Sequence, residues 1–203
     1  MEISVRSNIK EFTRGVNDLV KRQVPFAASK TINTIAYELS KQEFVSEMDS
    51  QLDKPTRFTR QAFVYQQSTK RNLTSIVRAK QIQKSYLHWQ VDGGHRAPKN
   101  RAIPIPVGQK RNAYGNMPKG AVKRLAGNKK TFSGIPRGRK TPGIYQRTGK
   151  KGRGGLKLMV KWQPEGANYH KRIDFLSVAE RVVRARFPRL MSANLAAAIR
   201  TAR

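Results

Sequence analysis

The 203-residue sequence has no cysteine, few acidic residues and no long apolar run. The absence of cysteine excludes a disulfide framework and a thiolate metal site, and it is compatible with assembly in a reducing cytoplasm. No apolar stretch is long enough to cross a bilayer, and residues 1–10 alternate polar and apolar side chains, unlike a signal peptide. We therefore expect no membrane as a partner. A hydrophobic fraction of 37% allows only a modest core.

Residues that commonly carry catalysis or hold metals are also scarce. The three histidines, His88, His95 and His170, form no HxxxH pair, and only Asp92 offers a nearby second ligand to His95. No serine lies in a nucleophile elbow, and the few carboxylates fall mostly in the amino-terminal helices, at positions typical of a surface. We expect a protein that is not an enzyme and that has no catalytic residue, cofactor or metal.

Positive charge dominates what remains. The 42 Lys and Arg residues oppose 12 Asp and Glu, which gives a net charge of +30, and no acid occurs between Asp92 and Glu165. Such a segment repels itself in water, so it needs a polyanion or an acidic protein surface to neutralise it. The residues that we expect to bind DNA or a protein partner are Arg96, Lys99, Arg101, Lys110, Arg111, Lys123, Arg124, Lys129, Lys130, Arg137, Arg139, Lys140, Lys150, Lys151 and Arg153.

Residues 93–155 also contain most of the glycines and the majority of the prolines. The prolines hold residues 103–106 (IPIP) extended, because a residue that precedes proline avoids the helical region. Much of the segment has no sustained periodicity, and a structureless loop of this length is uncommon in a compact domain. We interpret residues 93–155 as a basic arm that reaches over a neighbouring subunit or faces DNA.

The tip of the expected hairpin at residues 150–155 (KKGRGG) has two interpretations. It is not a Walker loop, because the spacing is wrong and no Gly-Lys-Ser/Thr precedes a helix. A solvated turn and a turn that contacts phosphate both remain open.

Three aromatic residues, Tyr114, Phe132 and Tyr145, are interleaved with the basic residues. Aromatic rings beside arginines are typical of platforms on which single-stranded nucleic acid stacks. Amphipathic aromatics are also the usual anchors of protein interfaces. The rings are sparse and lack the pattern of RNA-recognition sheets, so we favour their anchoring the arm to a neighbouring surface.

Hydrophobic periodicity predicts helices at the amino-terminal end. Apolar residues recur at helical spacing in residues 4–22, and again from Pro25 to about residue 48. A short helix carrying residues 58–63 follows, and then a β-branched strand at residues 73–80. Residues 82–91 fit either a strand or a helix, and we favour a helix.

Strands and further helices are predicted towards the carboxyl end. Residues 143–147 (GIYQR) and 156–162 (LKLMVKW) are typical of two strands. A capping box at residues 177–180 opens a helix that Pro188 kinks or ends, and a last short helix follows. The predicted fold class is α+β, as a single domain with a small antiparallel sheet. Its amino-terminal helical part covers residues 1–92, the arm covers 93–155, and residues 156–203 complete the domain.

The order of several segments resembles the minor tail protein Z family, the tail completion proteins of long-tailed bacteriophages. The resemblance covers nearly the whole chain in order. The similar segments are an opening amphipathic helix, residues 24–36 (VPFAASKTINTIA), the basic residues 57–71, residues 103–107 (IPIPV), residues 142–147 (PGIYQR) followed by the strand 156–162, and residues 173–178 (IDFLSV) leading into a final basic helix.

The resemblance implies a structural role in the virion. Related neck and tail completion proteins are small α+β domains that form rings, commonly sixfold, at the head-proximal end of the tail. It therefore implies a head–tail connector subunit in a homo-oligomeric ring, expected to be a hexamer, assembled in the host cytoplasm. The implied partners are neighbouring tail and neck proteins, with DNA in the ring's lumen.

Composition alone favours another class, a sequence-nonspecific nucleic-acid-binding protein of ribosomal or nucleoid type. The alanine-rich amino-terminal helices argue against it, because they suit packing better than insertion into a groove.

Overall fold

The computed structural model describes residues 16–17, 19–149 and 154–201. It combines helices with small antiparallel sheets, which confirms the α+β class. The sequence predicts a single domain, whereas the chain folds into two compact units. The first unit comprises Met1–Gln51, Arg57–Ser85 and Ile173–Arg203, and the second comprises Leu52–Thr56 and Tyr86–Arg172.

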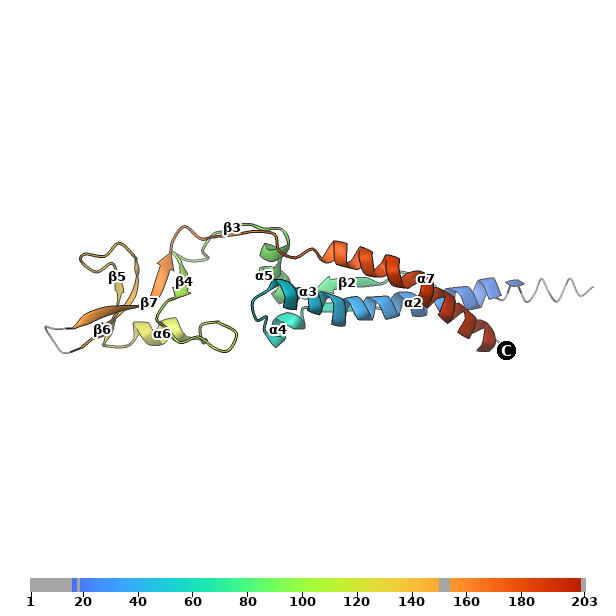
Figure 1. Cartoon of the computed structure of the whole chain (residues 1–203), viewed down its shortest axis with the longest axis horizontal. Coiled ribbons are helices and arrows are strands. Elements are labelled where there is room, and N and C mark those ends of the chain that lie inside the picture. Colours follow the sequence, from blue (N-terminus) through green and yellow to red (C-terminus); the bar gives the residue numbers. More distant parts are fainter. Residues whose placement is uncertain (1–15, 18, 150–153, 202–203) are drawn as a thin grey trace, which may run out of the picture. The chain divides into compact units, whose positions relative to one another are not determined.

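The amino-terminal helices of the first unit follow one another without a break (Figure 1). The π-helical turn η1 (Leu19–Gln23) leads into α2 (Val24–Glu38), and the π-helical turn η2 (Leu39–Glu43) leads into α3 (Phe44–Gln51). Pro25 lies in the first turn of α2, directly after the widened turn that accommodates its ring and its missing N–H. The predicted separation into two helices is therefore wrong. Residues 4–15 of the first predicted helix lie outside the described residues.

A short helix and a hairpin complete the middle of the first unit. Helix α4 (Arg57–Arg60) precedes β1 (Phe63–Gln66), which pairs antiparallel with β2 (Ile76–Ala79). Helix α5 (Gln81–Val91) follows, as predicted. The sequence predicts Phe63 in the short helix, but Phe63 starts β1 instead, because the backbone N–H of Ala62 closes the last turn on Thr59.

The last helix, α7 (Phe175–Thr201), runs through Pro188, so the prediction of a separate final helix is wrong. The predicted capping box is also wrong. The helix begins before Ser177, and the backbone N–H of Ser177 donates to Oδ1 of Asp174 at 3.2 Å. The carboxylate of Asp174 therefore satisfies an N–H that has no partner within the helix.

Helices α2 and α7 lie side by side and form the centre of the first unit (Figure 1). Buried alanines at Ala27 and Ala36 of α2 let the two backbones approach closely, and Val182 and Ala198 of α7 are buried as well. The apolar stripe predicted for α2 is thus confirmed. The packing of this stripe against α7 brings an amino-terminal helix and the carboxy-terminal helix into one core.

An aromatic triad joins three segments of this core. The ring of Phe44 lies 4.7 Å from that of Phe63 and 4.9 Å from that of Phe175, and the latter two are 4.7 Å apart. Their tilted and edge-on geometry is the arrangement that aromatic rings prefer. The triad fixes α3 and the start of α7 against β1.

A part-buried hydrogen bond also couples α2 to α7. The hydroxyl of Thr31, which is fully buried, donates to the carbonyl of Ala27 (2.8 Å) and accepts from Nδ2 of Asn194 (2.9 Å). We expect Thr31→Val to lower the free energy of unfolding by about 1–3 kcal/mol, because the amide of Asn194 loses its acceptor. Urea unfolding measures the change. Thr34→Val is the control, because Thr34 makes the same bond to Lys30 at an exposed position. Equal effects of the two substitutions would contradict the coupling.

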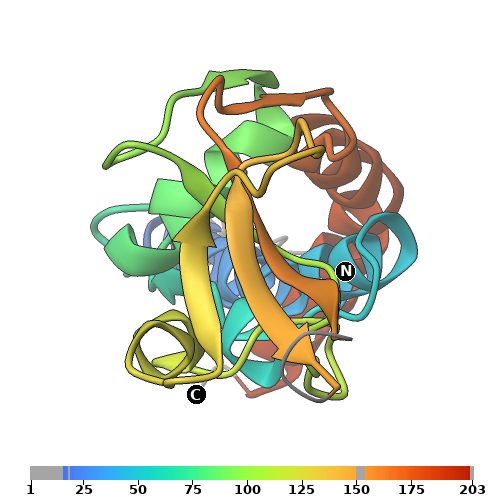
Figure 2. The same ribbon diagram turned by 90° about the vertical axis from the view of Figure 1, so that its left-hand side faces the viewer.

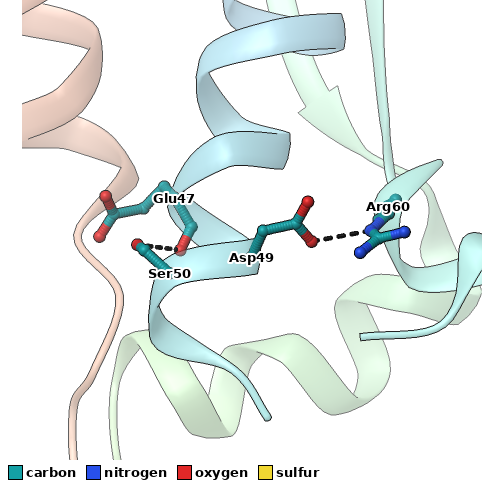
Figure 3. A network of polar contacts seen from close by, with 4 residues as sticks. All are labelled: Glu47, Asp49, Ser50 and Arg60. Atoms are coloured by element: carbon teal, nitrogen blue, oxygen red, sulfur yellow. Dashed lines mark hydrogen bonds and ion pairs between the residues drawn. The ribbon is translucent and has the colours of Figure 1, made fainter. Parts of the chain in front are cut away.

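Acidic side chains of the first unit pair with its arginines. Asp49 of α3 accepts a 2.7 Å hydrogen bond from Nε of Arg60, and the hydroxyl of Ser50 donates to the carbonyl of Glu47 (Figure 3). Arg186 of α7 lies 2.6 Å from Glu38. The exposed Asp49–Arg60 pair stabilises the fold by no more than about 1 kcal/mol. These acids neutralise basic residues locally in the first unit.

The second unit is built from antiparallel strands. Strand β3 (Gly94–Arg96) pairs with β8 (Ala167–Tyr169). A four-stranded sheet has the order β4-β7-β6-β5, and Figure 2 shows β5, β6 and β7 side by side, with α6 (Ala121–Ala126) near β5. The bounds of its strands are Ile103–Pro106 for β4, Thr131–Gly134 for β5, Gly143–Thr148 for β6 and Gly155–Gln163 for β7.

The predicted hairpin of residues 143–147 and 156–162 is confirmed, but the interpretation of residues 93–155 as an extended arm is wrong. This segment supplies four strands, β3 to β6, and helix α6. The strands are three to six residues long, so no periodicity is sustained in the sequence. At Gly143 an added Cβ would lie 2.4 Å from the carbonyl oxygen of Val160, so this glycine permits close strand pairing.

Both faces of the four-stranded sheet are covered. Ile144 and Tyr145 are consecutive residues of β6 and therefore point to opposite faces, yet they are 1% and 0% exposed. Val160 of β7 is also fully buried, and Ala121 of α6 is buried. The second unit thus has a small core of its own.

Candidate interaction surfaces

Most of the predicted binding residues lie on the surface of the second unit. Arg96 is half-buried, and the other described members of the predicted set are exposed. Lys150, Lys151 and Arg153 lie outside the described residues, so the choice between a solvated and a phosphate-contacting tip remains open. The second unit contains only three acids, Asp53, Asp92 and Glu165. Its surface charge is therefore strongly positive.

Several of these arginines bond to backbone carbonyls. Arg111 donates to Pro106 at 2.7 Å, Arg124 donates to Lys119 at 3.0 Å, and Arg139 donates to Leu156 at 3.3 Å. A carbonyl orients a guanidinium but leaves its positive charge uncompensated. These side chains are thus held in place with their charge still available to an anion.

Two arginines and two aromatic rings form a cluster on β5, β6 and their connection. Phe132 pairs with Tyr145 across the strands, with ring centroids 6.0 Å apart and planes 22° apart. The guanidinium of Arg147 lies 4.7 Å from the centre of the Phe132 ring, and that of Arg139 lies 5.8 Å from the centre of the Tyr145 ring. These distances are typical of cation–π contacts. We call Phe132, Arg139, Tyr145 and Arg147 the arginine–aromatic cluster.

The cluster overturns the expectation that these rings anchor an arm to a neighbour. Tyr145 is fully buried, and its hydroxyl donates to the carbonyl of Thr141 at 2.7 Å. Phe132 is half-buried beneath Arg147. Neither ring presents a free face for bases to stack on. Tyr114 is 44% exposed, so its ring is accessible to a neighbouring surface.

Of the two arginines of this cluster, the predicted set of basic residues includes Arg139 and omits Arg147. The alternation of strand β6 places Arg147 on the same face as Tyr145, so the signal is present in the sequence. The position of Arg147 over Phe132 depends on the pairing of β5 with β6. That pairing joins segments separated by a turn, and the sequence does not specify it.

An apolar groove opens on the first unit between α2, the β1–β2 hairpin and α7. Its volume is about 320 Å³, and its lining includes Ile32, Ile35, Leu73, Val183 and Phe187. Leu73 is 43% exposed and Val183 is 40% exposed. A groove with this lining suits another apolar surface better than a polar ligand.

The described residues contain no cluster of three or more acids and histidines that could hold a metal ion. His95 instead bonds Oδ1 of Asn168 through Nδ1 at 2.7 Å. In the described part of the chain, no helix is both long enough and apolar enough for a transmembrane segment. Comparisons with protein families, curated proteins and solved structures give no match.

Proposed function

We propose that this chain is a virion structural protein, a tail completion or neck subunit that forms a ring at the head-proximal end of a phage tail. The order of the family-like segments supports the proposal. These segments coincide with structural elements, since residues 24–36 lie in α2, residues 103–107 include β4, residues 142–147 include most of β6 and residues 173–178 lead into α7. In this role the protein joins the tail to the head, is assembled in the host cytoplasm and has no enzymatic activity.

The observation that carries the proposal is the unfilled apolar surface of the first unit. Val183 and Leu73 border the groove, and Ile76 on β2 is 51% exposed. Small domains bury such side chains against other subunits, and most homo-oligomers are closed and symmetric. A ring of copies, expected to be a hexamer, would cover these residues.

Oligomerisation tests the proposal directly. We expect the purified chain to form closed rings that mass photometry and negative-stain electron microscopy detect. Val183→Glu should weaken association about 10–100-fold, because one apolar side chain contributes about 1.5–3 kcal/mol when it is buried. Leu176→Glu is the matched control, since Leu176 lies on the same helix, is 70% exposed and is not in the groove lining. A wild-type chain that stays monomeric at all concentrations contradicts the ring.

The virion role has a separate test. Inactivation of this gene in the phage that encodes it should yield filled heads and free tails that do not join. Normal infectious particles would contradict tail completion.

The strongly positive surface of the second unit, with no acid from residue 93 to 164, favours a second candidate, the sequence-nonspecific nucleic-acid-binding protein. In that case the chain would bind nucleic acid as a monomer, and its loss would leave virion assembly unchanged.

A further inference from the structure

Two cations lie directly opposite each other at the end of the β5–β6 pair. Thr131 pairs with Gln146, and the backbone N–H of Arg147 bonds the carbonyl of Lys130 at 2.8 Å, so the register continues to Lys130 and Arg147. Both side chains are exposed. Like charges opposite each other on one face of a sheet are destabilising unless an anion lies between them. The sequence supplies no carboxylate from residue 93 to 164.

A third cation reaches the same end of the sheet from the β5–β6 connection. Arg139 donates to the carbonyl of Leu156, and Leu156 is the residue that pairs with Arg147 on β7. Arg139 also lies over Tyr145, which is on the same face as Arg147. Lys130, Arg139 and Arg147 therefore converge on one end of one face of the sheet.

The rings beneath the arginines hold this arrangement in place. A guanidinium that stacks on a ring uses its flat face and keeps its in-plane N–H donors available for a phosphate. The contacts to Phe132 and Tyr145 already restrict the arginine side chains. An anion that binds these arginines therefore costs less side-chain conformational entropy. The two arginine side chains are thus preorganised for an anion.

We propose that Lys130, Arg139 and Arg147 form a binding site for the phosphodiester backbone of DNA. The site contacts phosphates and does not read bases, because Tyr145 is buried and Phe132 is beneath Arg147. Binding is therefore independent of sequence. Planar guanidinium groups match phosphate oxygens with two parallel hydrogen bonds.

An acidic protein is the competing class of partner, and the cluster suits it less well. Protein interfaces usually rely on aromatic anchors that enter a pocket of the partner. The two rings of this cluster are packed within the second unit instead. Cations without an accessible aromatic anchor fit a repeating phosphate chain better.

This inference goes beyond the proposed function, because the site would bind DNA whether or not the protein completes a tail. The test uses the full-length protein and a labelled duplex of arbitrary sequence, with fluorescence anisotropy measured over salt concentrations of about 50–200 mM. Arg139→Gln/Arg147→Gln should weaken binding by about 10–100-fold near 0.1 M salt and make the log–log salt dependence shallower by about 2.

A matched pair of substitutions controls for the loss of net charge. Arg71→Gln/Arg78→Gln removes two exposed arginines of the first unit and should leave the salt dependence unchanged. Arg139→Lys/Arg147→Lys keeps both charges and should keep the slope. Lys130→Gln disturbs neither ring contact, so it tests the site even if the arginine variants fold poorly, and its expected slope change is about 1.

Equal slope changes from the cluster pair and the first-unit pair would overturn the inference, because they would indicate diffuse attraction. Tighter binding of polyglutamate than of duplex would also overturn it, in favour of an acidic protein. Ring assembly is measured separately, so a wild-type chain that forms rings but does not bind duplex DNA would refute only this site.

Discussion

Replacement of Phe44 by alanine is expected to lower the free energy of unfolding of the first unit by about 3–5 kcal/mol. Phe44 is 5% exposed, and its ring contacts both Phe63 and Phe175. The truncation removes a buried ring and two favourable aromatic contacts, and it leaves a cavity where α3, β1 and α7 meet. A domain of this size has a total stability of about 5–15 kcal/mol, so much of it would be lost.

Urea unfolding of the full-length chain measures this change, and hydrogen exchange followed by mass spectrometry locates it. Faster exchange should appear in α3, β1 and the start of α7. Phe58→Ala is the control, because Phe58 belongs to the same unit but is 52% exposed. We expect it to change stability by less than about 1 kcal/mol. If both substitutions had the same effect, the triad would not be the centre of this core.

Tyr145→Ala should destabilise the second unit to a similar extent, by about 3–5 kcal/mol. The ring is fully buried, it packs on Phe132, and its hydroxyl bonds the carbonyl of Thr141. Tyr145→Phe separates these contributions, because it keeps the ring and loses only the hydrogen bond. We expect the latter change to lower stability by about 0.5–1.5 kcal/mol.

Hydrogen exchange should place the effect of Tyr145→Ala in β5, β6 and β7. Tyr114→Ala is the matched control, since Tyr114 is a tyrosine of the same unit at 44% exposure. Comparable protection in both variants would mean that Tyr145 is not part of the core of the sheet.

The elements that could be predicted from sequence are those with a sustained period. The stripe of α2 and the alternation of the nine-residue β7 extend over enough residues to be distinguished from chance. Residues 93–155 differ, because their strands are short and are separated by glycine and proline turns. Such strands are stabilised by their partners in the sheet, and pairing between distant residues leaves no local pattern.

Two boundary errors have a local cause. Asp174 and Ser177 can each cap a helix, and the spacing of Ser177 and Glu180 satisfies the capping-box pattern. The structure uses Asp174, because Phe175 must enter the helix to reach the aromatic triad. Phe63 likewise lies in β1 instead of the predicted helix, and its ring contacts Phe44 of the same triad. In both cases tertiary packing decides between local options of similar energy.

The candidate site could be predicted in its chemistry but not in its geometry. Composition alone indicated that the acid-free segment binds a polyanion or an acidic surface. The convergence of Lys130, Arg139 and Arg147 depends on strand register and on a bond from Arg139 to a carbonyl of β7. Neither follows from periodicity.

The hydrogen bond between Thr31 and Asn194 links residues 163 positions apart. A ribosome that adds about 5–20 residues per second therefore exposes the apolar stripe of α2 for roughly 10–30 s before α7 is made. The second unit is nearly continuous in sequence, from Tyr86 to Arg172, and it is complete before α7 emerges. During synthesis, the second unit is therefore complete while the apolar side of α2 is not yet covered by α7. Chaperones can bind the amino-terminal helices in this interval.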